Sequence, residues 1–116
     1  MWIFTRDGFF SVAATKLCQT GEVAVRARKK DHLENLIARH GLDAEILRFP
    51  GTDYNYRIQI PKALWADILS REAEGIDYNS FKDAMAGAGA SADYLRAMFA
   101  TWAEIHKIQS TELKGD

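Results

Sequence analysis

The chain has 116 residues, of which 15 are basic and 16 are acidic, and 47% of its residues are hydrophobic. A chain of this length and composition fits one globular domain that buries roughly two-thirds of its unfolded surface, which excludes intrinsic disorder. The formal net charge of −1 excludes a strongly basic nucleic-acid coat or an acidic tail, although it is compatible with a local charged patch.

Cys18 is the single cysteine, so no intramolecular disulfide can form, and a reducing compartment is compatible with the sequence. No apolar run approaches the roughly 20 residues that a membrane helix needs. Arg6 and Asp7 interrupt the apolar amino terminus before it reaches signal-peptide length. We therefore predict a cytoplasmic protein that does not bind a membrane.

The amino-terminal part of the chain has the pattern of three strands. Residues 2–5 form a short apolar run, Asp7 and Gly8 are typical of a tight hairpin turn, and residues 9–15 predict the second strand. Residues 23–28 predict a third strand with one buried face, because two sets of side chains alternate there: Val23, Val25 and Ala27 against Ala24, Arg26 and Arg28.

The first helix is expected to follow this strand. Asp31, with Glu34 three residues later, resembles a capping box at the helix start. Gly41 is expected to end the helix in the left-handed conformation, with Leu42 closing it. The buried stripe of this helix is expected to consist of Leu33, Leu36 and Ile37.

The stretch of residues 54–71 reads as a strand that runs directly into a helix, and residues 44–49 predict a strand before it. Pro61 fixes φ and suits the first position of the helix, which is expected to continue to about Glu74. The strand is expected to turn four side chains inward: Tyr54, Tyr56, Ile58 and Ile60. An apolar stripe at helical spacing follows: Leu64, Trp65, Ile68 and Leu69.

The carboxy-terminal part predicts two helices. Asp77 or Asn79 can cap a short helix at residues 80–86, residues 87–90 form a small-residue linker, and Ser91 is a good cap for the last helix. One face of the last helix is apolar: Leu95, Met98, Phe99, Trp102, Ile105 and Ile108.

These elements predict an α+β fold. It consists of an antiparallel sheet of four to five strands, two helices on one face in ββαββα order, and a helical C-terminal segment that completes the core. We expect a single domain over residues 1–116, with the sheet and two helices in residues 1–74, the helical segment in residues 75–110 and a frayed tail in residues 111–116.

Two segments resemble a family of short, uncharacterised bacterial proteins. They are Met-Trp-Ile-Phe-Thr-Arg-Asp-Gly-Phe-Phe-Ser at residues 1–11 and Gly-Ile-Asp-Tyr-Asn-Ser-Phe-Lys at residues 75–82. Tyr94 and Trp102 extend the resemblance, which runs nearly end to end. The resemblance implies no activity, cofactor or functional residue.

A basic patch is expected on the sheet face opposite the helices. The candidate phosphate or nucleic-acid contacts are Arg26, Arg28, Lys29, Lys30 and Arg57. Cations on a flat sheet can contact phosphates, and neighbouring aromatic rings can stack on bases. However, the aromatic-rich RNA-binding signature is absent, and the simpler interpretation is a solvated face balanced by Glu22 and Glu45.

Aromatic residues suggest two further sites. A candidate partner surface consists of Trp2, Phe4, Phe9, Tyr78 and Met98, and an unpaired edge strand could also pair with a second copy to give a dimer. A small-molecule pocket between the sheet and the last helix would be lined by Tyr56, Trp65 and Trp102. The alternative for both sets is that they form the core.

Local patterns predict no catalytic residue, metal or cofactor. His32, His40 and His106 have no histidine at a spacing of four, and Cys18 has no partner at zinc spacing. No phosphate-binding loop or nucleophile motif occurs, whereas a site built from distant segments would leave no such local pattern.

We therefore predict a small, non-enzymatic regulator or adaptor that binds another protein or associates with itself. The alternatives are nucleic-acid binding through the basic sheet face and small-molecule binding in the aromatic pocket.

Overall fold

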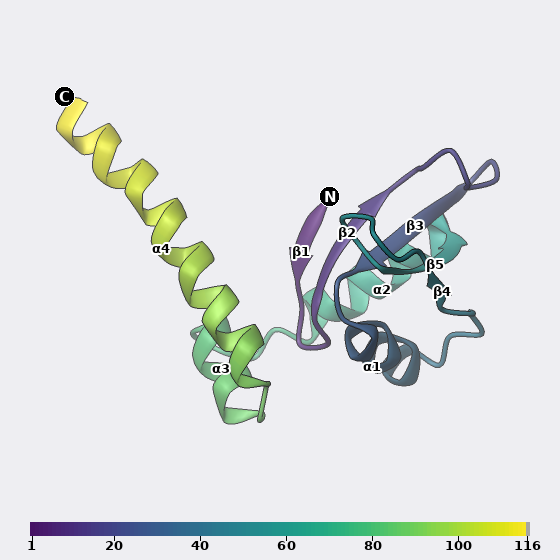
Figure 1. Cartoon of the computed structure of the whole chain (residues 1–116). Coiled ribbons are helices and arrows are strands. Elements are labelled where there is room, and N and C mark those ends of the chain that lie inside the picture. Colours follow the sequence, from purple (N-terminus) through teal and green to yellow (C-terminus); the bar gives the residue numbers. More distant parts are fainter. Residues whose placement is uncertain (116) are drawn as a thin grey trace. The chain divides into compact units, whose positions relative to one another are not determined.

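The computed structural model describes the backbone of residues 1–115 and the side chains of residues 1–112. The chain divides into two compact units, Met1–Ile76 and Asp77–Asp116 (Figure 1). The division lies within two residues of the boundary expected between residues 74 and 75.

The first unit is built on a five-stranded antiparallel sheet in the order β1-β2-β3-β5-β4. The predicted hairpin is present between β1 and β2, where backbone hydrogen bonds join Thr5 and Gly8 in both directions. The strands are β1 (Trp2–Phe4), β2 (Phe9–Ala13), β3 (Glu22–Ala27), β4 (Leu47–Arg48) and β5 (Tyr56–Pro61).

β3 and β5 form the centre of the sheet and turn their apolar side chains to the same face. Val25 and Ile58 lie opposite each other in the β3–β5 register and are fully buried. Both α1 (Lys30–His40) and α2 (Lys62–Glu74) contact β3 and β5 and cover this face (Figure 1). Full burial of one such side chain stabilises the fold by about 1.5–3 kcal/mol. The predicted alternation is therefore confirmed in both strands.

The helix ends of the first unit follow the sequence, except at the starts of α1 and α2. Gly41 ends α1 in the left-handed conformation with φ 61°, and Leu42 donates its N–H to a carbonyl of the last turn. α2 ends at Glu74 as expected. The prediction that Asp31 caps α1 is wrong, because the N-cap is Lys29 and makes no side-chain cap hydrogen bond. Asp31 lies in the first turn, where its charge suits the helix dipole.

Three strands differ from the prediction by two residues or more, and the first of them is β2, which ends at Ala13 rather than Thr15. The strand expected at residues 44–49 is reduced to the two residues of β4, which pairs with β5 at the sheet edge. β5 begins at Tyr56 rather than Tyr54 and includes Pro61, so α2 starts one residue later than expected. Proline is tolerated there because a strand end needs no N–H from it, and its φ of −57° leads into the helix.

The second unit consists of α3 (Phe81–Gly87) and α4 (Ala92–Gly115). Ser80 is the N-cap of α3 and accepts a hydrogen bond from the Asp83 N–H at 3.4 Å, so the assignment of this cap to Asp77 or Asn79 is wrong. The buried side chains of the two helices include Met85, Tyr94 and Met98.

α4 begins directly after Ser91, as predicted, and continues through the segment that was expected to be a frayed tail. Residue 116 of that tail lies outside the described residues.

The predicted α+β class, antiparallel sheet and C-terminal helix are confirmed. β2 to α2 follow the expected ββαββα order, with β1 added at the edge of the sheet. The helical C-terminal segment was expected to complete the core, but the buried core cluster draws its residues from the first unit alone, between Phe10 and Ile68. Within the described residues, no helix combines the length and apolar content that a membrane span requires.

Gly8 provides a test of the hairpin packing. A Cβ added at Gly8 would overlap the His32 ring, whereas one added at Gly21 would meet open space, and both glycines have positive φ. We expect Gly8→Ala to lower the free energy of unfolding by about 1–3 kcal/mol more than Gly21→Ala does, because only the first adds an overlap to the backbone strain. Urea denaturation of both variants measures this, and equal losses would contradict the packing described.

Candidate functional site

The sheet face turned away from α1 and α2 carries the predicted basic residues. Arg26 on β3 lies directly opposite Arg57 on β5, and like charges in such a pair destabilise a sheet by up to about 1 kcal/mol. Each guanidinium instead lies over an aromatic ring, Arg57 at 4.4 Å from the Phe49 centroid and Arg26 at 5.0 Å from the Tyr54 centroid. We call this surface the arginine face and define it by Arg26, Arg28, Arg57, Phe49 and Tyr54.

Arg57 is buried beside the positive charge of Arg26, and both features change its ionisation. Its residue surface is only 9% exposed, and burial lowers the pKa of its guanidinium below the ordinary value. The positive charge of Arg26 lowers the same pKa further, while Cys18 acts in the opposite sense. Within the described residues, the Nε of Arg57 has no hydrogen-bond partner.

Tyr54 was expected to point inward, and this prediction is wrong. Because β5 begins at Tyr56, Tyr54 lies in the irregular segment before the strand and does not follow its alternation. Its ring is buried beneath two guanidiniums, those of Arg26 at 5.0 Å and Arg28 at 4.4 Å from the ring centroid. Arg28 also donates from Nε to the backbone carbonyl of Asp53. The Tyr54 ring therefore contacts two cations of the arginine face.

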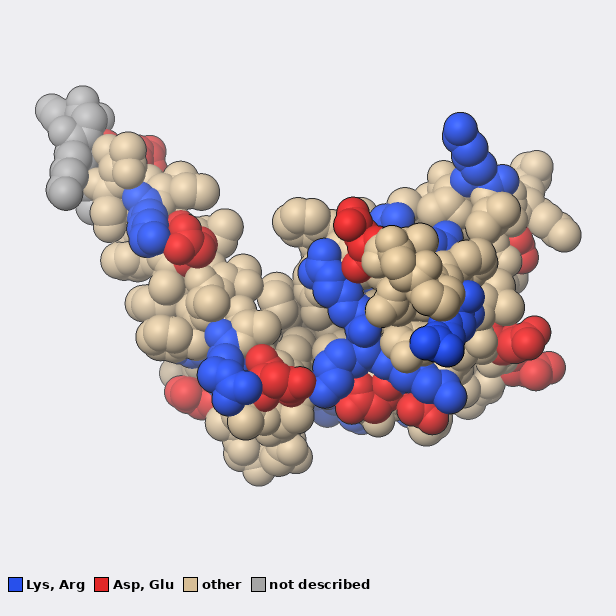
Figure 2. Space-filling model, in the orientation of Figure 1, with Lys and Arg blue, Asp and Glu red and all other residues tan. Residues whose placement is uncertain are grey.

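The arginines of this face, Arg26, Arg28 and Arg57, have no carboxylate partner among the described residues. Glu22, expected to balance them, instead accepts a hydrogen bond from the Gln19 N–H at 2.8 Å. Figure 2 shows Lys and Arg side chains gathered over the first unit.

Lys29 and Lys30 lie beside this face, where β3 passes into α1. Lys29 is the α1 N-cap residue and forms an ion pair with Asp31 at 3.9 Å, whereas Lys30 is exposed.

Three aromatic residues of the predicted partner surface border the arginine face. Ser11 on β2 lies opposite Trp2 of β1 and opposite Arg26 of β3. Paired residues lie on the same face, so Trp2 shares the sheet face of Arg26. The Phe9 ring lies 4.7 Å from that of Phe4 and 6.3 Å from that of Trp2. Trp2 is 77% exposed.

A second candidate surface lies on α4. Four large apolar side chains follow one another at intervals of three residues, and each is between 53% and 65% exposed. We call them the α4 ridge: Phe99, Trp102, Ile105 and Ile108. Trp102 stacks on Phe99 at 6.0 Å and on His106 at 5.1 Å, and Lys82 of α3 lies 5.0 Å from both the Phe99 and Trp102 ring centroids.

The remaining predicted residues are not brought into one site. Met98 is 5% exposed and belongs to the buried part of the second unit, so it cannot serve as a surface contact. Tyr78 is half-buried against Phe81. For the predicted pocket, Trp65 is part of the core of the first unit and Tyr56 packs against that core. Trp102 lies on α4 in the second unit, and the aromatic pocket stays a prediction.

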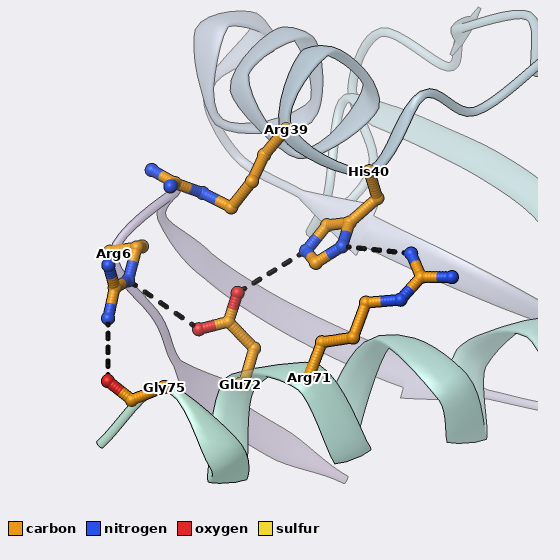
Figure 3. Close-up of a pocket in the computed structure, with 6 residues that line it drawn as sticks. All are labelled: Arg6, Arg39, His40, Arg71, Glu72 and Gly75. Carbon is orange, nitrogen blue, oxygen red and sulfur yellow. Dashed lines mark hydrogen bonds and ion pairs between the residues drawn. The ribbon is translucent and has the colours of Figure 1, made fainter. Parts of the chain in front are cut away.

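A polar cluster that local patterns did not reveal lies at the ends of α1 and α2. Its side chains line a cavity of about 300 Å³ (Figure 3) and come from the β1–β2 turn, the last turn of α1 and the last turns of α2. The lining residues are Arg6, Arg39, His40, Arg71, Glu72 and Gly75.

The contacts of His40 define its tautomer. Arginine can only donate, so the contact of 3.5 Å from Arg71 Nη1 leaves the lone pair on His40 Nδ1. The ring proton then lies on Nε2 and points toward Glu72 Oε1, 3.3 Å away. The other oxygen of Glu72 lies 3.8 Å from Arg6 Nε. A buried carboxylate, Asp7, joins the cluster through Arg39 Nε at 2.7 Å.

Comparison with known proteins leaves the geometry as the sole guide to function. No protein-family model, curated protein or solved structure matches this chain. The resemblance to short bacterial proteins stays a prediction, and no functional residue is transferred from elsewhere.

Tyr54 allows the arginine face to be tested. Tyr54→Leu keeps an apolar side chain under the guanidiniums but removes two cation–π contacts, each of about 0.5–1 kcal/mol. We therefore expect urea denaturation to give a loss of about 1–2 kcal/mol in the free energy of unfolding. Tyr78→Leu serves as the control, because no guanidinium lies over that ring among the described contacts. Equal losses in the two variants would mean that the stacking contributes nothing.

Proposed function

We propose that this protein is a non-enzymatic interaction module that associates with a second copy of itself through the α4 ridge. The observation that carries the proposal is the exposure of four large apolar side chains in a row on one helix. Contiguous exposed apolar side chains mark interaction surfaces, whereas single ones are ordinary.

The length of the two helices in the second unit supports this proposal. α3 has seven residues and α4 has 24, so α3 can cover only part of the α4 apolar face. Tyr94 and Met98, near the start of α4, are buried, while the ridge that follows them is exposed. Helices gain most of their stability from packing of the apolar face, so a partner on the ridge would stabilise α4.

The order of side chains within the ridge favours a second copy as the partner. Its first half is aromatic, Phe99 and Trp102, and its second half is aliphatic, Ile105 and Ile108. In a two-fold antiparallel pair centred on the ridge, Trp102 of one copy meets Ile105 of the other, so a planar side chain packs on a branched one. Phe99 and Ile108 lie about 180° apart around the helix and so border the two sides of this contact. Glu104 and Lys107, the charged neighbours within the same stretch of α4, pair with each other at 2.8 Å, and the Lys82 ammonium lies over the Phe99 and Trp102 rings.

The size of the ridge predicts weak association. Each of its four side chains offers roughly 100 Å² for burial, which gives at most about 800 Å² for the two copies together, because Phe99 and Ile108 lie on opposite sides of the helix. Specific interfaces of standard size bury about 1,200–2,000 Å². We therefore expect reversible dimerisation with a Kd in the range of about 10–100 µM rather than a permanent dimer.

Sedimentation velocity between about 5 and 500 µM protein tests the proposal. We expect the mass to rise from one chain toward two with concentration, and to change little with salt because the contact is apolar. Trp102→Glu should abolish the rise, since it introduces a charge into the centre of the ridge.

Ala100→Glu is the matched control, because it adds the same charge to an exposed position of α4 on the opposite side of the helix from Trp102. It should dimerise like the original protein. A chain that stays monomeric throughout, or equal effects of the two glutamates, would refute association through the ridge.

A second candidate function is single-stranded nucleic-acid binding on the arginine face. The specific observation that favours it is the set of unneutralised guanidiniums of Arg26, Arg28 and Arg57 beside the exposed aromatic ring of Trp2. Grooves that combine cations with stacking rings bind single strands without strong sequence preference.

Anisotropy of a labelled oligo-dT tests this second function across a range of salt concentrations. Binding should weaken with salt by about 0.7 logarithmic units per phosphate contact, and Arg26→Gln should lower that slope by about the same amount. Arg48→Gln is the control, because Arg48 pairs with Tyr56 and so lies on the other face of the sheet. Binding that is absent, or equally affected by both substitutions, would exclude the arginine face as a nucleic-acid site.

A further inference from the structure

Three side chains of the polar cluster have the donor atoms and the spacing of a metal site. His40 Nε2 lies 3.3 Å from Glu72 Oε1 and 4.0 Å from Asp7 Oδ2, and donor atoms of the three residues lie within 4.8 Å of one another. The ligands of a tetrahedral ion with bonds of about 2.1 Å stand about 3.4 Å apart. His40 and Glu72 have that spacing. Asp7 Oδ2 must move about half an ångström closer to His40 Nε2, and its spacing to Glu72, which is within 4.8 Å, must shorten to the same value.

Asp7 provides an independent observation that points to a cation. Its side chain is 1% exposed, and its Oδ1 accepts the charge-assisted hydrogen bond from Arg39 Nε at 2.7 Å. Its Oδ2 is equally inaccessible but accepts no hydrogen bond from any described residue. A buried, unsatisfied carboxylate oxygen costs about 1–3 kcal/mol or more. A cation between Asp7 and His40 would remove that cost.

The arginines orient the two carboxylates for this role. Arg39 holds Oδ1 of Asp7 and leaves Oδ2 directed at the cluster. Arg6 lies 3.8 Å from Oε2 of Glu72 and leaves Oε1 near His40. Outer contacts of this kind orient metal ligands and tune their affinity.

We propose that Asp7 Oδ2, His40 Nε2 and Glu72 Oε1 bind one divalent transition-metal ion of the zinc type. One imidazole with two carboxylates suits zinc and its neighbours, whereas calcium and magnesium prefer oxygen ligands alone. His40 and Glu72 also line the cavity of about 300 Å³ (Figure 3), which leaves room for water at a fourth position. The site is independent of the α4 ridge, which belongs to the second unit.

Arg71 competes with the metal. Its contact with Nδ1 requires the ring proton on Nε2, but a metal on Nε2 moves that proton to Nδ1, where it faces the guanidinium. Arg71 is exposed and can turn into solvent, so it weakens the site without closing it. The three nearby arginines also repel a cation, and we expect micromolar rather than nanomolar affinity for zinc.

Titration calorimetry with zinc alone and the full chain tests the proposal. We expect one zinc ion per chain, binding weakened by about tenfold or more in Glu72→Gln, and binding strengthened several-fold in Arg71→Gln. Arg48→Gln removes the same charge from an exposed position outside the cluster and should change nothing. The gain on removing Arg71 separates this site from general attraction of zinc to acidic residues.

Cobalt absorption gives a second readout that does not depend on stability. Cys18→Ser and His106→Ala should retain the visible bands of a four-coordinate ion with nitrogen and oxygen ligands, and Glu72→Gln should lose them. Circular dichroism of each variant verifies folding. The proposal is overturned if zinc does not saturate at one ion per chain, if Glu72→Gln binds as tightly as the original protein, or if Cys18→Ser or His106→Ala abolishes binding.

Discussion

The pairing of β3 with β5 is the constraint on which the first unit depends. Its register sets Val25 opposite Ile58 and Arg26 opposite Arg57, so a single alternation sends the core to one face and the cations to the other. A shift of one residue in either strand would bury the arginines and expose the isoleucines, at a cost of several kcal/mol. The helices α1 and α2 and the arginine face take their positions from this register.

The like charges of this register are compatible with a stable sheet because aromatic rings come from outside the paired strands. Phe49 follows β4 and Tyr54 precedes β5, and each provides a ring face under a guanidinium. Among the described residues, these cations contact aromatic rings and form no ion pair with a carboxylate. The candidate surface of the second unit is apolar rather than charged. It is the α4 ridge, which α3 is too short to cover.

Predictions from short-range patterns were confirmed where the residue type strongly favours one backbone conformation. Gly41 is a left-handed helix end because glycine adopts that conformation without strain, and Asp7 and Gly8 form the hairpin turn. Predictions were wrong where the adjoining element or the packing of another helix decided the position of a residue. Asp31 was expected to cap α1, but the strand before it leads into the helix two residues earlier, at Lys29. Met98 was expected on a surface, but it is buried with α3 and α4.

The sequence by itself determined the fold class, the alternation of β3 and β5, and the side of the sheet on which Arg26 and Arg57 lie, because these follow from periodicity within a few residues. Only the tertiary structure decided the reversal of Tyr54, which depends on where β5 begins, and the cluster of Asp7, His40 and Glu72. Asp7 and His40 are 33 positions apart along the chain, and His40 and Glu72 are 32 positions apart. Spacing in the sequence carries no signal for them, since the contact arises only when the β1–β2 turn meets the ends of two helices.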